Sequence, residues 1–534
     1  MKKSVRMLIT VVAFALAFLV GCGSAAAPAP SGAAPAAATP DDTDFLYHAY
    51  MSTPYVTLDP SSEDSNGIMV LRNVYETLTY YNDETREVEP QLAESWTQNE
   101  DSTEWVFTIR QDAKFHDGTP VNGEAVAASI QRTKDLGRGG AFNWDPVTKI
   151  EVTGEYEVTF TCSEPCPLDL IAASCYASYI MSLEASTHDT EWFNEGNDGG
   201  SGPYTIASIT SDTVALKAFE DYRGGWVDEQ YKSVVIGQVS ESSSRRQLLE
   251  TGEAHIASNF STTDWTALVS NTDAVSTYTA ESWQNVILFL NTQSEPCNNA
   301  DFRRALAYAF PYQDVIDNAL NGAGTRSYGL IPAGLWGHNE DLAPYETDLE
   351  KAKEYLEKSG VDVENTPIVF TYTNGFDAYS TFSQLFQANL KQIGITLELR
   401  SMEWDSQFSM ANNTNPEDRQ DISVMQWWPD YGDPRGWFMA LVHTTKDPTS
   451  TMNWSYLSDA DRDARIEEAV RLSATDRGAA TKIYDELQKE ILEECYFIHA
   501  YDMANQYALS NAITDVHENP AYAGVIQYYN VRKA

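Results

Sequence analysis

The sequence predicts an α/β fold on two observations. In the second half of the chain, helical and extended patterns alternate, in the order helix 348–359, strand 368–372, helix 379–393 and strand 395–399. That alternation is typical of βαβ connections and of sheets that are mostly parallel. In addition, about 490 residues follow a low-complexity N-terminal segment, which is enough for two or three domains with ample cores.

Residues 1–21 are predicted to form an export signal. Lys2, Lys3 and Arg6 give it a positive start, and its apolar core 7–20 is short for a membrane span. The segment ends in Leu-Val-Gly before Cys22, which resembles the bacterial lipobox, where a lipid is attached to the cysteine and the chain is cut before it. We therefore expect a lipid on Cys22, with an ordinary secretory signal as the alternative.

Residues 22–42 are predicted to be a tether. They are almost all Ala, Pro, Gly, Ser and Thr, a composition that cannot bury enough apolar surface to fold. At roughly 3 Å per extended residue, the tether would reach a few tens of ångströms. The protein is thus expected outside the cell, anchored by lipid to the outer face of the cell membrane, or on the periplasmic side where an outer membrane exists.

The charge of the chain limits its partners. The formal net charge is −43, and cleavage of the signal, with its three basic residues, would leave −46. A chain this acidic will not hold nucleic acid or an anionic membrane surface by charge. No apolar run after the signal approaches the length of a membrane span.

The cysteines and histidines predict no metal site and no cofactor. Five cysteines follow Cys22, namely Cys162, Cys166, Cys175, Cys297 and Cys495. The first three could pair outside the cell, but five is an odd number and their redox state stays open. The eight histidines are scattered and form no HxH or HExxH motif, so structural or free thiols are expected rather than a zinc site.

In the first half, a strand is predicted to open at residues 45–47 and to reach 53–60, where a turn follows. Residues 105–110 alternate with period two, as a half-buried strand does. Residues 112–120 turn into a helix near 124–136.

Eight short motifs carry a resemblance to a known family. They are LDP at 58–60, PQLAESW at 90–96, WVFTIR at 105–110, KFHDGTP at 114–120, GSGPY at 200–204, LETGE at 249–253, FLN at 289–291 and DFRRALAYA at 301–309. In this order they resemble the extracellular solute-binding proteins of ABC importers, in the subfamily that includes oligopeptide-, dipeptide- and nickel-binding proteins. The resemblance runs from about residue 45 to the C-terminus.

The resemblance implies a two-lobed periplasmic-binding-protein-like fold with mixed sheets, two crossing segments and an extra domain inserted in the first lobe. The implied first lobe comprises 43–65, 196–283 and 501–534; the insert is 66–195 and the second lobe 284–500. Residues 496–501 resemble one of the segments that cross between the lobes.

The elements of the implied second lobe have local signals of their own. Asp348 is a capping residue for helix 348–359, Lys358 lies in its last turn, and Gly360 follows it. Gly394 ends helix 379–393 in the same way. Residues 421–425 form a short β-branched strand, and helices are predicted near 461–472 and 475–494.

The loop after that strand, residues 426–434 (QWWPDYGDP), is the principal candidate site. Its prolines and glycine forbid regular structure, so Trp427, Trp428 and Asp430 should lie on a loop at a strand end, where open α/β sheets tend to bind ligands. Two indoles beside an acid suit a cation or an extended organic ligand, although a turn with core aromatics would read the same way. The resemblance implies a role for this acid: in the peptide-binding members, an Asp at the position of Asp430 takes the peptide's free ammonium, with an aromatic residue three before it, as Trp427 is here.

Four further aromatic residues are weaker candidates for ligand contact. The loop at Tyr55 would offer backbone hydrogen bonds to an extended ligand. Trp283, before the strand 285–291, Phe260, after the strand 253–258, and Trp404, at the end of another strand, stand where family members line the pocket. For each, a structural role is the alternative.

Enzyme chemistry is not expected. Asp430 and Asp433 could in principle serve hydrolysis, yet turns use Asp-Gly and Asp-Pro routinely. The chain has no GxSxG nucleophile elbow, and its Gly-rich stretches at 137–140 and 196–202 lack the Lys-Ser/Thr ending of a phosphate loop.

The expected function is therefore capture and delivery of a solute. The resemblance implies a lipid-tethered, monomeric binding protein that closes on a di- or oligopeptide and presents it to an ABC permease with its ATPases. An oligosaccharide or a nickel chelate is the alternative solute, and a secreted hydrolase is the distant alternative function.

Overall fold

The structure is a computed structural model that describes residues 44–174, 176–363, 367–445 and 451–534. The predicted signal, Cys22 and the tether lie outside the described residues, as does Cys175. Within the described part of the chain, every helix is too short or too polar to cross a membrane.

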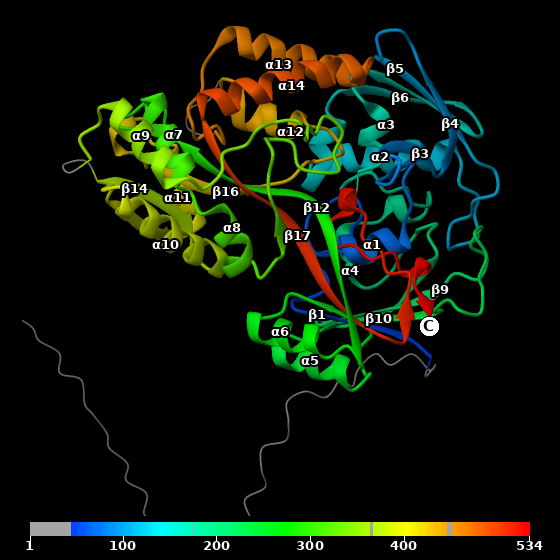
Figure 1. The fold of residues 1–534 in the computed structure, drawn as a ribbon. Coiled ribbons are helices and arrows are strands. Elements are labelled where there is room, and N and C mark those ends of the chain that lie inside the picture. Colours follow the sequence, from blue (N-terminus) through cyan, green and yellow to red (C-terminus); the bar gives the residue numbers. More distant parts are fainter. Residues whose placement is uncertain (1–43, 175, 364–366, 446–450) are drawn as a thin grey trace, which may run out of the picture.

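A single sheet of eleven strands runs through the molecule (Figure 1). Its order is β15-β14-β16-β12-β17-β11-β1-β10-β9-β8, and β13 adds to β17. The two central strands are the longest, β12 (Val275–Leu290) and β17 (Phe497–Ser510), and they pair antiparallel along most of their length. They are the crossing segments, because each has one half in each lobe.

The second lobe lies on one side of β12 and β17 and contains three strands. They are β14 (Ile368–Thr373), β15 (Leu397–Met402) and β16 (Ile422–Trp427). β14 pairs in parallel with both of the others, as the βαβ pattern predicts, while β16 pairs antiparallel with β12. The sheet is therefore mixed.

The second lobe contains the following helices, of which those near 348–359, 379–393, 461–472 and 475–494 were predicted from the sequence. They are α7 (Ala300–Ala309), α8 (Tyr312–Asp314), α9 (Leu349–Ser359), α10 (Asp377–Gln392), α11 (Trp404–Ala411), α12 (Arg435–Trp437), α13 (Ala460–Ser473) and α14 (Arg477–Glu494). Asp348 caps α9 through hydrogen bonds from the amides of Glu350 and Lys351, and Gly360 ends it with φ of 68°. A positive φ suits glycine, which lacks a Cβ, so the predicted stop is confirmed.

The first lobe lies on the other side of the crossing strands. Its strands are β1 (Leu46–Tyr50), β8 (Tyr204–Ile209), β9 (Thr213–Ala218), β10 (Ser233–Gln238) and β11 (Ile256–Ser258), with helices α5 (Ser242–Glu250) and α6 (Thr262–Ser270). The first predicted strand was drawn too long, because β1 ends at Tyr50 and residues 53–58 form an irregular loop. The predicted turn follows at Asp59, whose carbonyl accepts from the amide of Ser62 at 3.0 Å.

The insert has its own four-stranded sheet, in the order β4-β5-β7-β6. These four strands are β4 (Ala93–Gln98), β5 (Glu104–Ile109), β6 (Val147–Gly154) and β7 (Glu157–Cys162). β2 (Thr79–Asn82) and β3 (Glu87–Pro90) pair with each other in a separate two-stranded sheet. The helices of the insert are α1 (Ile68–Val74), α2 (Gly123–Leu136), α3 (Leu168–Ile171) and α4 (Thr190–Asn194). The strand and helix predicted at 105–110 and 124–136 correspond to β5 and α2.

Short elements complete the description. β13 is Gly324–Thr325, and the last strands β18 (Ile513–Thr514) and β19 (Arg532–Lys533) pair with each other. A 3₁₀ turn, η6 (Pro520–Tyr522), lies between them in sequence.

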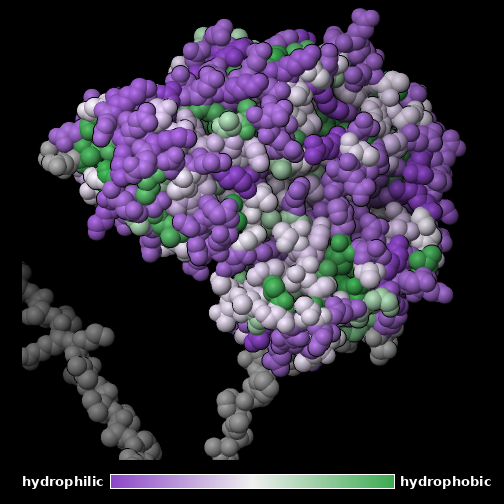
Figure 2. Space-filling model, in the orientation of Figure 1, coloured by the Kyte–Doolittle hydropathy of each residue, from purple (hydrophilic) through white to green (hydrophobic). Residues whose placement is uncertain are grey.

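The largest hydrophobic core is shared between the insert and the second lobe. It contains Phe107 and Phe160 of the insert, Trp283 of β12, and Trp437 and Tyr484 of the second lobe. Polar contacts add to this junction: Arg477 of α14 pairs with Asp169 of α3 at 2.7 Å. On another side of the molecule, the surface is hollowed between the second lobe around α10 and the first lobe around α5 and α6 (Figure 2). The exact lobe boundaries drawn from the sequence stay a prediction.

Candidate functional site

The loop after β16 is held by hydrogen bonds to two other parts of the chain and by a local bond to the start of α12. The indole of Trp336 donates to the carbonyl of Gly432 at 2.8 Å. The hydroxyl of Ser174, in the insert, donates to the carbonyl of Asp430 at 2.9 Å. The carboxylate of Asp433 accepts from the amide of Arg435 at 2.7 Å, which fixes the start of α12. The loop is therefore a rigid edge where the insert meets the second lobe.

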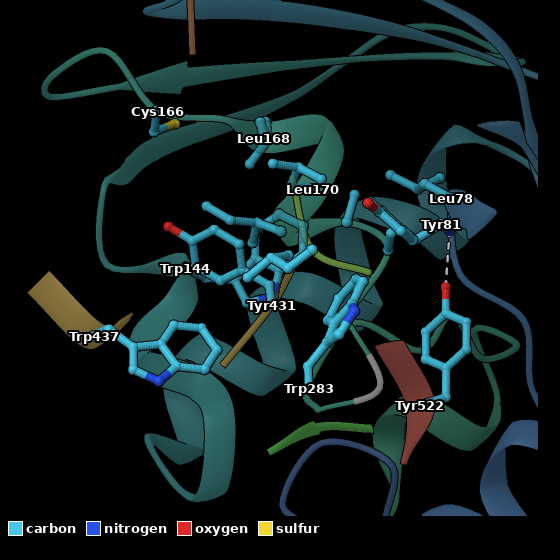
Figure 3. Packing of buried hydrophobic residues seen from close by; sticks show 14 of the residues in the cluster. Leu78, Tyr81, Trp144, Cys166, Leu168, Leu170, Trp283, Tyr431, Trp437 and Tyr522 are labelled. Atoms are coloured by element: carbon cyan, nitrogen blue, oxygen red, sulfur yellow. Dashed lines mark hydrogen bonds between the residues drawn. The ribbon is translucent and has the colours of Figure 1, made fainter. Parts of the chain in front are cut away.

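A small cavity lies directly beside this loop. Its walls come from the loop (Trp428 to Gly432), from β12 (Trp283 and Gln284), from the insert (Tyr81, Leu170, Ala173, Ser174 and Tyr176) and from η6 and its neighbour (Pro520 to Ala523). Figure 3 shows Trp283 between Tyr431 on one side and Tyr81 and Tyr522 on the other. The free volume is about 30 Å³, close to that of one water molecule.

Asp430 is the one acidic residue among the described residues that line this cavity. Its carboxylate receives no hydrogen bond and forms no ion pair with a described residue, although the side chain is largely removed from solvent. Burial raises the pKa of this carboxyl above its usual value, and the positive charge of Arg435 offsets part of the rise. A half-buried acid with unused acceptor positions favours a cationic partner.

Trp283 forms the back wall of the cavity. It is 1% exposed, and its ring meets that of Tyr81 edge to face at 4.9 Å. A Cβ on Gly432 would lie 3.2 Å from the Trp283 ring, so a glycine permits this close approach. The indole Nε1 of Trp283 is buried without a hydrogen-bond partner among the described residues.

A second, polar hollow adjoins the first one, and the two share Gln284 and Ala523. It measures about 150 Å³ and is lined by His48, Tyr50, Ser258, Asn259, Asn505, Gln506, Tyr507 and Gly524. Burial lowers the pKa of His48 to about 4, so the ring is neutral at physiological pH. The lining of this hollow thus carries hydrogen-bonding groups but no charge.

Three of the seven residues predicted for the site are brought together: Asp430, Trp428 and Trp283 all line the cavity. Trp283 lies within β12 rather than before it, at a register irregularity between Glu281 and Asn285. Trp428 is 48% exposed and therefore available to a ligand.

The other four predicted residues lie outside the lining of both hollows. Trp427 turns the other way, and its indole donates to the carbonyl of Gly436 at 3.1 Å. The hydroxyl of Tyr55 donates to the carbonyl of Thr210, between β8 and β9. Phe260 lies beside Trp265 and the guanidinium of Arg245, and Trp404, the first residue of α11, packs against Trp454.

Sequence reasoning missed the contribution of the insert and of the C-terminal segment. Tyr81, Ser174, Tyr176 and Tyr522 are isolated in sequence and stand in no motif that points to a ligand. Gln284 follows Trp283 directly and could have been named with it. The others become neighbours of Asp430 only through long-range packing.

Asp430 and Asp433, the acid pair considered for hydrolysis, lie in different surroundings. Asp433 is 2% exposed and points away from the cavity lining, into the junction with Arg477 and α13. Within the described ranges, no group of three or more His, Cys, Asp or Glu side chains is placed to hold a metal ion.

Comparisons with known proteins place the chain in context. The family described as "Bacterial extracellular solute-binding proteins, family 5 Middle" matches residues 87–449. The probable D,D-dipeptide-binding periplasmic protein DdpA of Escherichia coli (strain K12) is 29% identical over 487 residues, covering 89% of this chain and 92% of that protein.

Solved structures agree in fold. The periplasmic binding protein DppA from Helicobacter pylori, in complex with the peptide STSA, matches with a TM-score of 0.70 at 21% identity, covering 92% of this chain and 98% of that one. NikA from Brucella suis, in complex with Fe(III)-EDTA, matches with a TM-score of 0.76 at 20% identity, covering 91% and 100%. At these identities the likeness concerns the fold alone.

Proposed function

Because the chain belongs to the bacterial extracellular solute-binding proteins of family 5, a family of binding proteins that work with ABC permeases, we propose that it captures a short peptide by its free ammonium at Asp430. In this proposal the protein is tethered through a lipid on Cys22 and delivers the peptide to its permease. Membership of this family makes it a binding protein, not an enzyme.

The observation that carries the proposal is the carboxylate of Asp430. It lacks a partner among the described residues, lies in a half-buried position, and is bordered by aromatic walls. A desolvated ammonium needs a charge partner, and a charge-assisted hydrogen bond contributes about 1.5–3 kcal/mol net. A peptide's N-terminal ammonium would pair with this carboxylate, so each charge would offset the desolvation cost of the other.

The surroundings of Asp430 support an organic ligand rather than a bare cation. Trp428 and Tyr176 offer ring surfaces at the cavity, on which an apolar side chain can pack. The adjoining hollow offers uncharged amides, among them Gln284 and Asn505, for hydrogen bonds to peptide groups. A peptide with its N-terminus at Asp430 and its next residue in this hollow would make both the ring contacts and the amide hydrogen bonds.

The free volume implies that binding requires movement. Pockets for small organic ligands measure about 300–1,000 Å³, whereas the cavity at Asp430 has about 30 Å³ and the adjoining hollow about 150 Å³. A separation of the lobes about β12 and β17 would join and widen the two spaces, and closure would then bury the ligand. The half-exposed Trp428 is the wall residue with most freedom to move.

Relatives point in the same direction. DdpA is named as a D,D-dipeptide-binding protein, and the Helicobacter pylori protein holds the peptide STSA. The NikA structure holds a metal chelate instead, so the fold itself accepts other solutes. The carboxylate of Asp430, which has no partner within the described ranges, favours the peptide.

Calorimetry with Asp430→Asn tests the proposal. A pool of di- to tetrapeptides and the same pool after N-acetylation are titrated into wild type and variant. Leaving a buried ammonium unpaired costs about 2–5 kcal/mol, which is roughly a thirtyfold to several-thousandfold loss of affinity. Acetylation should weaken binding to wild type by a similar factor and binding to Asp430→Asn much less, because both changes remove one ion pair.

Asp405→Asn is the matched control, since Asp405 is an exposed acid of the same lobe. It should bind both pools as wild type does. Full peptide affinity in Asp430→Asn would refute the ammonium site. Tight binding of an oligosaccharide pool that depends on Trp428 and not on Asp430 would favour the sugar alternative.

A further inference from the structure

Two cysteines of the insert lie in direct contact. Cys162 is the last residue of β7, and Cys166 follows four residues later, just before α3. Their sulfur atoms are 2.8 Å apart, and the two residues are 6% and 3% exposed. Both backbones are fixed at this distance, because the amide of Cys162 donates to the carbonyl of Thr103 at 2.7 Å and that of Cys166 to Ser102 at 3.4 Å.

We propose that Cys162 and Cys166 form a disulfide in the exported protein, and that this bond braces the wall of the ligand cavity. A disulfide needs two sulfurs that can approach to about 2.05 Å without backbone rearrangement. A shift of under an ångström, shared between two side chains, satisfies that need here. Family membership places the chain outside the cytoplasm, where such bonds form and persist.

The two cysteines would have different roles in forming the bond: Cys162 is the nucleophile, and Cys166 resolves the mixed disulfide. A hydrogen bond from the Cys166 thiol lowers the pKa of Cys162, and the ammonium of Lys134 acts in the same direction. The thiolate of Cys162 would attack an oxidised protein disulfide of the exporting cell and form a mixed disulfide. The Cys166 sulfur would then attack Cys162, releasing the donor as a dithiol. The two thiol hydrogens and two electrons pass to the donor, so the exchange is balanced.

The position of the bond connects it to the site. Cys166 leads directly into α3, and Figure 3 shows Cys166, Leu168 and Leu170 along this one segment. Leu170 and Ser174 line the cavity, and Ser174 donates to the carbonyl of Asp430. Asp169, directly before Leu170, forms an ion pair with Arg477 of the second lobe. A disulfide at the start of this segment would therefore limit the movement of one cavity wall.

The bond also fixes the rim of a larger hollow on the far side of this wall. Glu164, Pro165 and Cys166 border a space of about 740 Å³ between the insert and the second lobe, and Tyr431 lines both this space and the ligand cavity. With the loop 162–166 closed by a covalent bond, the insert side of the junction keeps its shape when the lobes move.

Differential alkylation of the exported wild-type protein tests the proposal. The protein is unfolded in acidic guanidinium with N-ethylmaleimide, which blocks free thiols while the low pH suppresses exchange, then reduced and labelled with iodoacetamide. Peptide mass spectrometry should find iodoacetamide on both Cys162 and Cys166. N-ethylmaleimide on both would overturn the pairing.

Cys175→Ser excludes a competing partner, because Cys175 is the other cysteine near in sequence. The proposal requires Cys162 and Cys166 to stay paired in this variant; a free thiol at either position would show a bond to Cys175 and contradict it.

The bracing role has its own test. Reduction with dithiothreitol should lower the thermal midpoint of wild type by a few degrees and leave that of the Cys162→Ser, Cys166→Ser double variant unchanged. An equal fall in the thermal midpoint of both proteins would refute a stabilising role for the disulfide.

Discussion

At the scale of single residues, neighbours in sequence take different roles at the site. Trp427 and Trp428 are adjacent, yet the first points to Gly436 and the second lines the cavity. Trp427 is the last residue of β16, where alternation directs successive side chains to opposite faces of the sheet. The orientation of Trp427 therefore follows from the register of β16 with β12, whereas that of Trp428 is set by the loop that follows the strand.

Substitution should separate the two indoles. Trp428→Ala should weaken solute binding by roughly two- to tenfold, since ring contacts contribute about 0.5–1.5 kcal/mol beyond area burial. Its stability should change little, because the side chain is 48% exposed. Trp427→Ala should instead lower the free energy of unfolding by about 1–3 kcal/mol, through lost packing and a lost hydrogen bond.

Calorimetry and urea unfolding of both variants check this division. A stability loss in Trp428→Ala that equals that of Trp427→Ala would show that Trp428 is a packing residue in solution.

Gly432 allows a prediction about the cavity wall. Its substitution by alanine would bring a methyl group to 3.2 Å from Trp283 and 3.3 Å from Tyr81. Overpacking of this kind costs about 1–3 kcal/mol in stability, and the indole would be displaced toward the cavity. Gly432→Ala should therefore lower both the urea midpoint and the affinity for solute. Gly478→Ala is the control, because Gly478 lies in the first turn of α14, where the added atom meets only the Asp476 carboxylate at an ordinary 3.4 Å; it should leave affinity unchanged.

The sequence predicted part of the site, for a physical reason. Asp430 and Trp428 could be named because proline and glycine mark their loop and a strand precedes it. Tyr81, Ser174 and Tyr522 could not, because they reach Asp430 from the insert and the C-terminal segment, and no local pattern encodes that approach. Trp404 shows the converse: it follows a strand, as predicted, but packs on Trp454.

At the scale of elements, the C-terminal segment packs a buried acid, Glu518, against the crossing strand β17. Glu518 is 1% exposed and accepts hydrogen bonds from Asn505 of β17 at 2.6 Å, from the amide of Gly524 at 2.7 Å and from Tyr507 of β17. Burial raises its pKa to about 7, against the opposing effect of these hydrogen bonds. The acid lies beside the polar hollow, whose lining includes Asn505 and Tyr507.

This shift predicts a pH dependence with a definite sign. Between the usual carboxyl value of 4.5 and about 7, the folded protein holds a proton on Glu518 that the unfolded chain has released. The stability contribution of the neutral acid is therefore complete at low pH and is lost as pH rises toward 7. Glu518→Gln should remove this part of the dependence.

Urea unfolding at about pH 5 and about pH 8 measures the effect. Relative to wild type, Glu518→Gln should lose less stability between the two values, and Glu94→Gln, at an exposed position of β4, should behave as wild type. Parallel curves for wild type and Glu518→Gln would contradict a raised pKa.

Elements that begin at a capping residue and end at a glycine were predicted well. The helix at 348–359 has a capping Asp and a terminal Gly, and α9 has both features in these places. The lengths of β12 and β17 were not foreseen, because polar residues such as Asn505 and Gln506 interrupt the apolar pattern of β17. Those residues are polar because that part of the strand borders the hollow, so the missed stretch belongs to the candidate site.

At the scale of the whole molecule, the insert is part of the binding structure. It shares the largest core with the second lobe and contributes five of the residues that line the cavity. The resemblance implied an insert in the first lobe, and in the structure it also joins the second lobe through Asp169 and Ser174. Movement of the lobes must therefore either carry the insert with the second lobe or break these contacts.

The proposed lipid anchor also concerns the whole molecule. Cys22→Ser should release folded, export-competent protein into the soluble fraction, whereas wild type should sediment with membranes. The charge of the body cannot replace the lipid, because an acidic protein is repelled by anionic lipids. Membrane fractionation with immunodetection measures this; soluble wild type with a free amino-terminal cysteine would contradict it.

The most direct test of the central claim is the identity of the solute that the protein retains. Wild-type protein and Asp430→Asn are exported from the same host, purified under native conditions, and the bound material is released and analysed by mass spectrometry. We expect peptides with free amino termini on wild type and far fewer of them on the variant. Oligosaccharide or a metal chelate on wild type, held equally by Asp430→Asn, would contradict it.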